Sequence, residues 1–336
     1  MAGLPEIPLE QGTPLALARR FPHKARALAE AAAGTFGHAS RIAAAIAAPL
    51  TDRASERWLV RQNNPYWPEI AQMAALLGLP GVVSLNVCFE WGCTSGVWPS
   101  ADGPVLRRVM DWAFPALGEN MVVLSQEGPA GDFSAITWPG IAGVFQGVAP
   151  GRFAAAINQA PMRRHGGGFV GDWLAGRHAV RNWHGLPPAH LLRSMFEHAA
   201  DYGAAKTLLC ETPIAVPAIF ILAGPQEGCI IERTETQAFV REMGPDGVAT
   251  ANHFRTDLDG QGRGWRARPI DSLGRAARAD ALCAADFAED FGWFVPPIAN
   301  AHSRLAFCAT AGGKLALMGT YGPTPVTQKL TLPGRA

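Results

Sequence analysis

The sequence predicts one large domain of the α+β class, in which strands form a central layer and helices lie on both sides. Of the 336 residues, 48% are hydrophobic, which is enough for one sizeable core. The first part of the chain has an alanine-rich composition that favours helices. The middle of the chain changes to short β-type runs separated by turn residues, and further helical segments follow.

The expected elements begin with helices. An alanine-rich stretch predicts helix over residues 15–47, with interruptions at Pro22, Gly34 and Gly37. A second helix is predicted over residues 64–79. The short apolar segment 81–92 is also expected to be helical. These helices would therefore precede the β-rich part of the chain.

Strands dominate after residue 92. The runs CTSGVWP and PVLRRVMDWAF flank the turn signal SADG, so they predict a hairpin. Helix returns over residues 187–209 and again over 272–291. The other β-type runs are MVVLSQ, FSAITWPG, IAGVFQGVAPGRFAAAINQA, AIFILAG, GCIIERTETQAFVREM and the closing hairpin RLAFCATAGGKLALMG.

Charge and hydropathy argue against nucleic acid and membranes as binding partners. Twenty-nine basic and 28 acidic residues give a net charge of +1, without a block of either sign. Such a surface builds no field for nucleic acid or for an anionic membrane. No stretch of about 18 apolar residues predicts a membrane span. We therefore expect a small-molecule or neutral lipid substrate.

The cysteines do not form a metal or disulfide pattern. All six are dispersed without a CxxC pair, so we expect reduced thiols and no metal site. The N-terminal stretch has no basic start followed by an apolar core, and no N-x-S/T acceptor occurs in the chain. These features favour a cytoplasmic protein. The cysteines are Cys88, Cys93, Cys210, Cys229, Cys283 and Cys308.

One cysteine, in the stretch FEWGCTSG, has a possible chemical role. Cys93 follows Gly92 directly. A buried cysteine that only packs is the common alternative. If the Gly92–Cys93 bond were cut, however, Cys93 would carry a thiol and a free α-amine. An α-amine has an ordinary pKa of about 7.7–8.0 and can act as general base for its own side chain. Glycine before the cysteine leaves room for attack on its carbonyl.

Three other polar residues can complete such a site. Arg108 and Asp111 follow Cys93 by 15 and 18 residues, so the predicted hairpin brings them back beside it. An arginine there would favour the thiolate, and an aspartate would orient the amine. A surface ion pair is the alternative. Asn252 follows a β-type run and can donate to an oxyanion, although a turn asparagine would have the same pattern.

Taken in order, these motifs resemble a known family. The segment PYWPEIAQMAALLGLPGVVSLNVCFEWGCTS is similar to the one that leads into the nucleophile of acid ceramidase and of N-acylethanolamine-hydrolysing acid amidase. Their central helix-then-strand segment resembles LLRSMFEHAADYGAAKTLLCETPIAVPAIFILAGPQEGCIIER. TANHFRTD matches the region of their later asparagine. The likeness runs, with gaps, from about residue 60 to the C-terminus.

The resemblance implies a cysteine N-terminal-nucleophile hydrolase with a four-layer αββα sandwich. It implies a helical pro-segment, residues 1–92, which self-cleavage separates from a catalytic domain, residues 93–336, to give two fragments that can form a heterodimer. Cys93 would be the nucleophile, and neither a cofactor nor a metal is implied. The other implied catalytic residues are Arg108, Asp111, Asn252 and an arginine placed at Arg266, with Arg268 and Arg275 as alternatives.

The chain departs from the family pattern at one site position. Where the family has asparagine-glutamate, this chain has Asn158 and Gln159. A glutamine cannot take up a proton, so the glutamate is dispensable or processing is altered. We expect both residues to contact substrate. Trp98, Trp112 and a glycine-rich loop at 163–173 are further pocket candidates, although either tryptophan can equally belong to the core.

The resulting hypothesis is hydrolysis of a linear N-acyl amide, ceramide-like or N-acylethanolamine-like, through a cysteine thioester. Two alternatives remain from the sequence. An acyltransferase or penicillin-type acylase would use the same nucleophile on other substrates. A non-catalytic binding protein would keep the chain uncut, with Gln159 as the sign of lost maturation.

Overall fold

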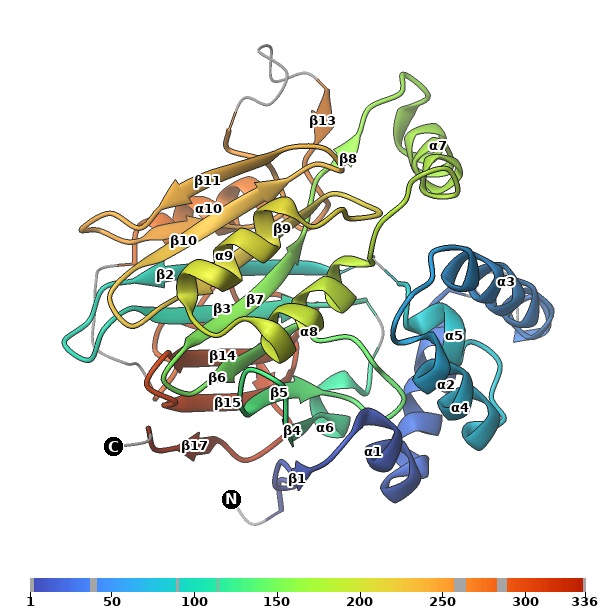
Figure 1. Ribbon diagram of the computed structural model, residues 1–336, viewed down its shortest axis with the longest axis horizontal. Coiled ribbons are helices and arrows are strands. Elements are labelled where there is room, and N and C mark those ends of the chain that lie inside the picture. Colours follow the sequence, from blue (N-terminus) through green and yellow to red (C-terminus); the bar gives the residue numbers. More distant parts are fainter. Residues whose placement is uncertain are drawn as a thin grey trace.

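The computed structural model describes residues 3–36, 41–88, 91–113, 115–256, 264–282 and 289–334. Two β-sheets pack face to face between layers of helices (Figure 1). The strands of the first sheet are, in spatial order, β1 (Leu9–Gln11), β4 (Val122–Gln126), β5 (Phe133–Thr137), β6 (Gln146–Ala149), β7 (Phe153–Gln159), β9 (Ala218–Ala223), β10 (Gly228–Arg233) and β11 (Ala238–Glu242). Those of the second are β12 (Val248–Thr250), β2 (Gly92–Trp98), β3 (Val105–Asp111), β14 (Ser303–Thr310), β15 (Leu315–Tyr321) and β16 (Thr324–Pro325), while β17 (Leu330–Leu332) also pairs with β15.

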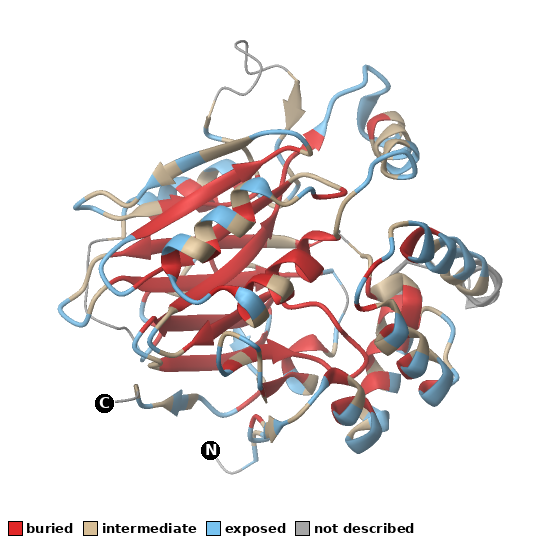
Figure 2. Ribbon diagram, viewed as in Figure 1, coloured by how far each residue is buried: buried red, intermediate tan, exposed pale blue. Residues whose placement is uncertain are grey.

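Helices cover the outer face of each sheet, which confirms the expected αββα order. The helices α8 (Pro188–His198) and α9 (Tyr202–Glu211) lie on the first sheet, against β7, β9 and β10. The helix α10 (Ser272–Asp280) lies on the second sheet, against β12 and β2. The central strands are buried along their whole length (Figure 2). Both faces are covered, so these strands read as continuous apolar runs.

Side chains alternate between two cores along the second sheet, because successive residues of a strand point to opposite faces. Cys93, Val97 and Met110 point inward and join the core between the sheets. Trp98 and Val109 point outward and pack in a separate core that includes Phe291, Trp293 and Ala279 of α10. This alternation decides which side chains can meet the thiol of Cys93.

The N-terminal segment folds beside the sandwich, as the blue helices of Figure 1 show. It contains α1 (Pro14–Arg20), α2 (Pro22–Phe36), α3 (Arg41–Arg61), α4 (Trp67–Leu77) and α5 (Val82–Leu85). The predicted helix over 64–79 is confirmed, and Gly78 ends it at a φ of 61°. Pro22 separates α1 from α2 as expected. Gly34 lies within α2 and interrupts nothing, while Gly37 lies outside the described residues. The segment is also not purely helical, since β1 pairs in parallel with β4.

Three other sequence expectations need correction. The expected helix 187–209 is two helices, because Asp201 caps the start of α9 with its side chain. The expected loop 163–173 instead begins in strand β8 (Met162–Arg163), which pairs with β13 (Trp265–Arg266), and continues into helix α7 (Gly168–Val180). The expected helix 272–291 ends at Asp280, and residues 283–288 lie outside the described residues.

The remaining short helix, α6 (Leu117–Asn120), packs against β14 and β15. Among the helices that the structure describes, none has the length and hydropathy needed to cross a bilayer.

Candidate active site

The β2–β3 hairpin places Cys93 at the start of a buried strand. Across the hairpin, Cys93 pairs with Met110, and Gly92 pairs with Asp111. Arg108 pairs with Ser95, two residues after the cysteine on the same face. The predicted hairpin is therefore formed in the register that brings Arg108 toward the thiol and Asp111 toward the Gly92–Cys93 bond. The thiol side chain is fully buried.

The guanidinium that donates to the thiol, among the residues that the structure describes, belongs to Arg108. Arg108 Nη2 donates to Cys93 Sγ over 3.0 Å and to the Ile157 carbonyl over 2.7 Å. Its Nη1 donates to the Phe145 carbonyl and to the side chain of Gln146, so the arginine has a fixed orientation. Burial raises the pKa of the Cys93 thiol, and the Arg108 charge and hydrogen bond oppose that shift. Burial thus favours the protonated thiol, while the adjacent guanidinium favours the thiolate.

The backbone of Cys93 is held by two other side chains. Its N–H donates to Asn252 Oδ1 over 2.9 Å, and its carbonyl accepts from Arg275 Nη1 at 2.5 Å. Arg275 Nη2 also donates to Asn252 Oδ1 over 2.8 Å. The amide nitrogen of Asn252 donates to the Gln159 carbonyl over 2.8 Å, which ties the second sheet to the end of β7. Both peptide groups that flank Cys93 are therefore clamped.

Asp111 completes the cluster on the opposite face of the sheet from the thiol. Its Oδ2 lies 3.4 Å from Arg275 Nη1, and its Oδ1 accepts from the Ser303 hydroxyl over 2.8 Å. All three side chains are fully buried. Burial raises the pKa of the Asp111 carboxyl, while Arg275 and the hydrogen bond from Ser303 act against that shift.

The arginine of the cluster is Arg275, one of the two alternatives to Arg266. The side chain of Arg266 is 36% exposed and forms an ion pair with Asp172 over 3.0 Å, away from Cys93. Arg268 contacts Asn252 through its backbone N–H and the Ala160 carbonyl through Nε. Arg275 reaches the cluster because it lies on the buried face of α10, near the start of that helix. The placement of Arg266 in the site is thus corrected.

Asn158 and Gln159 lie at the edge of the cluster. Asn158 Oδ1 accepts from the Ser95 hydroxyl over 2.7 Å, and its Nδ2 donates to the Ala251 carbonyl over 3.1 Å. Its amide is thereby engaged in joining β7 to β2. Gln159 contacts Asn252 through its backbone carbonyl, so this contact does not depend on which side chain it carries.

The two candidate tryptophans differ in position. Trp112 lies in an aromatic cluster, with ring centroids 5.5 Å from Trp91 and 5.9 Å from Phe145. This cluster adjoins the site, because Trp91 precedes Gly92 and the Phe145 carbonyl binds Arg108. Trp98 points to the outer face, and its ring lies 5.2 Å from the Arg107 guanidinium. Trp98 therefore cannot line a cavity at the thiol.

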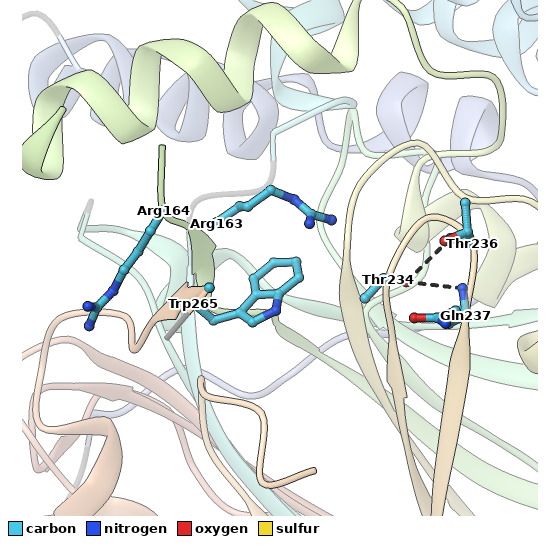
Figure 3. Close-up of a pocket in the computed structure, with 7 residues that line it drawn as sticks. Arg163, Arg164, Thr234, Thr236, Gln237 and Trp265 are labelled. Atoms are coloured by element: carbon cyan, nitrogen blue, oxygen red, sulfur yellow. Dashed lines mark hydrogen bonds between the residues drawn. The ribbon is translucent and has the colours of Figure 1, made fainter. Parts of the chain in front are cut away.

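An open cavity lies beyond the end of β7, between the β8–β13 pair and the turn after β10. Its volume is about 290 Å³. Figure 3 shows Arg163 extending across the Trp265 ring toward Thr236. The guanidinium already forms an ion pair with Glu235 over 2.8 Å. The cavity is thus lined by polar groups that are partly paired, and the start of the expected 163–173 loop borders it.

Two buried residues of the site were not singled out from the sequence. Gln146 holds Arg108, and Ser303 holds Asp111. Neither carried a signal, since isolated glutamine and serine residues in β-type runs are common. Within the described part of the chain, no group of three or more His, Cys, Asp or Glu side chains is placed to bind a metal.

Comparisons with known proteins bear on the family and the fold. No protein-family model matches the chain. Human acid ceramidase is 31% identical over 200 residues, which are 52% of this chain and 49% of that protein. Acid ceramidase of Heterocephalus glaber is 28% identical over 221 residues, 58% of this chain and 54% of that protein. The chain thus spans about half the length of the curated relatives it matches.

A solved structure extends the comparison to the fold. The Caenorhabditis elegans ortholog of N-acylethanolamine-hydrolyzing acid amidase superposes with a TM-score of 0.52 and 17% identity, over 72% of this chain and all of that one. That likeness supports the layered N-terminal-nucleophile hydrolase fold. This chain is thus similar in sequence to acid ceramidases and in fold to an ortholog of N-acylethanolamine-hydrolyzing acid amidase.

Proposed function

We propose that this protein hydrolyses linear N-acyl amides with Cys93 as the nucleophile, after it has cut its own Gly92–Cys93 bond. The observation that carries the proposal is the convergence of Arg108, Asn252 and Arg275 on the thiol and backbone of one cysteine that follows a glycine. The names of the related proteins, acid ceramidase and N-acylethanolamine-hydrolyzing acid amidase, point to amide hydrolysis of the same kind.

Self-cleavage would begin at the thiol. The Cys93 sulfur loses its proton and attacks the Gly92 carbonyl, the C–N bond breaks, and the nitrogen of Cys93 gains a proton. The acyl group of Gly92 then sits on sulfur as a thioester, which water hydrolyses. Arg108 favours the thiolate, and Asn252 and Arg275 hold the peptide group in place. The products are residues 1–92 and a fragment that begins at Cys93.

The freed α-amine makes the amidase cycle possible. It takes the thiol proton while sulfur attacks the substrate carbonyl, and it passes that proton to the leaving amine. We assign the tetrahedral oxyanion to the Asn252 side-chain nitrogen, which donates one hydrogen to the Gln159 carbonyl and carries a second. Water then cleaves the acyl-enzyme thioester and releases the acid.

The substrate is expected to carry an apolar acyl chain. Trp91, Trp112 and Phe145 form a buried aromatic cluster in the same core as Cys93, and we assign the acyl chain to this apolar region. Burial of such surface contributes roughly 25 cal/mol per Å² to binding. Long-chain amides would therefore bind more tightly than short ones.

After the cut, the two fragments would stay together as a heterodimer. Glu69 of the N-terminal segment pairs with Arg193 of α8 over 2.5 Å, and the Tyr66 hydroxyl donates to Glu197 over 2.6 Å. Strand β1 remains hydrogen-bonded in the first sheet. These contacts are mostly buried and do not depend on the Gly92–Cys93 bond.

One observation favours the alternative of an uncut binding protein: the thiol of Cys93 is fully enclosed in the uncut chain. Intact mass of fresh protein and of Cys93→Ala, at neutral and acid pH, separates the two. Native protein that yields residues 1–92 and 93–336, while Cys93→Ala stays whole, supports the hydrolase. The cut protein is then tested on N-acyl amides, with and without an added amine acceptor, to distinguish hydrolysis from acyl transfer. A native chain that stays whole at every pH refutes the proposal.

A further inference from the structure

Three neighbouring strands place Gly92, Asp111 and Ser303 in one row across the second sheet. Gly92 of β2 pairs with Asp111 of β3, and Asp111 pairs with Ser303 of β14. Residues that pair directly across neighbouring strands point to the same face. The Asp111 carboxylate therefore lies between the glycine of the proposed cleavage site and a buried hydroxyl.

A β-bulge creates this row. The register between β14 and β3 shifts between Ser303 and Leu305, since Leu305 pairs with Met110 and Ser303 with Asp111. Without the extra residue, Arg304 would lie opposite Asp111. Bulges re-aim side chains in this way and are common beside active sites. The irregularity thus exchanges an arginine for a serine beside the carboxylate.

The two carboxylate oxygens have different surroundings. Oδ1 accepts from the Ser303 hydroxyl over 2.8 Å, and the Ser303 oxygen itself accepts from the Asn300 N–H over 3.1 Å. Oδ2 is buried, and among the described residues no hydrogen bond reaches it. It lies 3.4 Å from Arg275 Nη1, and a β-carbon added to Gly92 would be 3.7 Å away. Ser303 thus occupies one oxygen and leaves the other beside Gly92.

We propose that Ser303 is a positioning residue for self-cleavage: it holds Asp111 so that Oδ2 receives the ammonium group formed at the Cys93 nitrogen. The inference rests on the proposed function. During the cut, the amide nitrogen becomes an amine and gains a proton, and an ionised carboxylate beside it stabilises that charge. The hydroxyl keeps Asp111 oriented, and by donating to the carboxylate it favours the ionised form against the effect of burial.

The groups around Asp111 determine in which direction its pKa moves when the Ser303 hydroxyl is removed. Burial is the largest influence and raises the pKa of Asp111, whereas Arg275 of α10, the side chains of Ser303 and Asn300, and His302 before β14 lower it. The Arg304 guanidinium and the Cys93 thiol also interact electrostatically with this carboxyl. A hydrogen bond to a charged group changes such an equilibrium by about ten- to hundredfold. Removal of the hydroxyl therefore makes Asp111 take up a proton at higher pH, and the acid limb of the cleavage rate moves up by about one to two pH units.

Full-length protein made by cell-free synthesis provides the test. Samples are diluted into buffers from pH 4 to 8, and the cut fraction is followed by intact mass. Ser303→Ala is expected to move the acid limb upward, Ser303→Thr to restore the native profile, and Ser303→Cys, a weaker donor, to lie between them. Thr310→Val, which removes a hydroxyl at the far end of the same strand, is the control.

The outcomes separate the two proposals. A displaced limb in Ser303→Ala with recovery in Ser303→Thr supports the positioning role. If Ser303→Ala fails to fold, Ser303→Cys is used instead: an acid limb at higher pH than the native one supports the positioning role, and a native acid limb overturns it. If Ser303→Ala is slowed equally at all pH values, or has the native pH profile, the positioning role of Ser303 is overturned. The proposed hydrolase function still stands in that case, because the native protein is cut. A native chain that never cuts overturns both.

Discussion

His190 should make the protein sensitive to mild acid. It is fully buried on α8, where its Nδ1 lies 3.0 Å from the side-chain nitrogen of Asn64 and its ring packs edge-on against Tyr66. Burial, and next the charge of Arg193, lower the pKa of His190 from 6.5 to about 3. The imidazole therefore stays neutral in the folded protein, at the contact between the N-terminal segment and the sandwich.

The direction of the pH dependence of stability follows from the lowered pKa of His190. Between about pH 6.5 and pH 3 the unfolded chain binds a proton at this residue that the folded chain does not. The contribution of His190 to stability is thus complete above pH 6.5 and is lost as pH falls toward 3. One pKa unit corresponds to about 1.36 kcal/mol, so lowering the pH from 7 to 5 costs about 2 kcal/mol from this residue.

Chemical unfolding at pH 7 and pH 5 measures the effect. His190→Gln keeps an acceptor for Asn64 and cannot be protonated. Between pH 7 and pH 5, the free energy of unfolding of this variant should therefore fall by about 2 kcal/mol less than that of the native protein. His198→Gln, on the exposed side of the same helix, leaves the buried imidazole in place and should retain the native dependence. Identical pH dependence in the native protein and His190→Gln would refute the reasoning.

Three further predictions concern the site. Arg275→Gln removes the partner of the buried Asp111, so it should lower stability by about 3–5 kcal/mol and prevent the cut. Arg266→Gln breaks an ion pair whose arginine is 36% exposed, so it should lower stability less and leave the cut in place. Unfolding curves and intact mass compare the two variants, and equal effects would contradict the placement of Arg275. Trp112→Phe should raise KM for long-chain amides more than for short ones, and an unchanged KM ratio would remove Trp112 from the acyl pocket. The contact of residue 159 with Asn252 is through the backbone, so Gln159→Ala should cut at close to the native rate; a slow cut by intact mass would show that the side chain takes part.

The sequence by itself determined the order of the elements and most of the cluster. Hydrophobic runs and turn signals predicted the hairpins of β2–β3 and β14–β15, because these strands pair with near neighbours in the chain. The hairpin also brought Arg108 and Asp111 to Cys93, since their separations of 15 and 18 residues match its length. Local pattern sufficed wherever partners lie within one supersecondary unit.

Only the tertiary structure decided the rest. Arg275 could not be chosen over Arg266 from the sequence, because the choice depends on which face of α10 packs against β2. Ser303 and Gln146 acquire their roles from pairing between strands far apart in the chain, and one of those pairs depends on a bulge. Both tryptophans follow β-type runs of the sequence, yet the pleat directs Trp98 outward and the packing of the two sheets places Trp112 in the core that contains Cys93. Long-range packing leaves no local signature, because any apolar or polar residue of similar size satisfies the same local pattern.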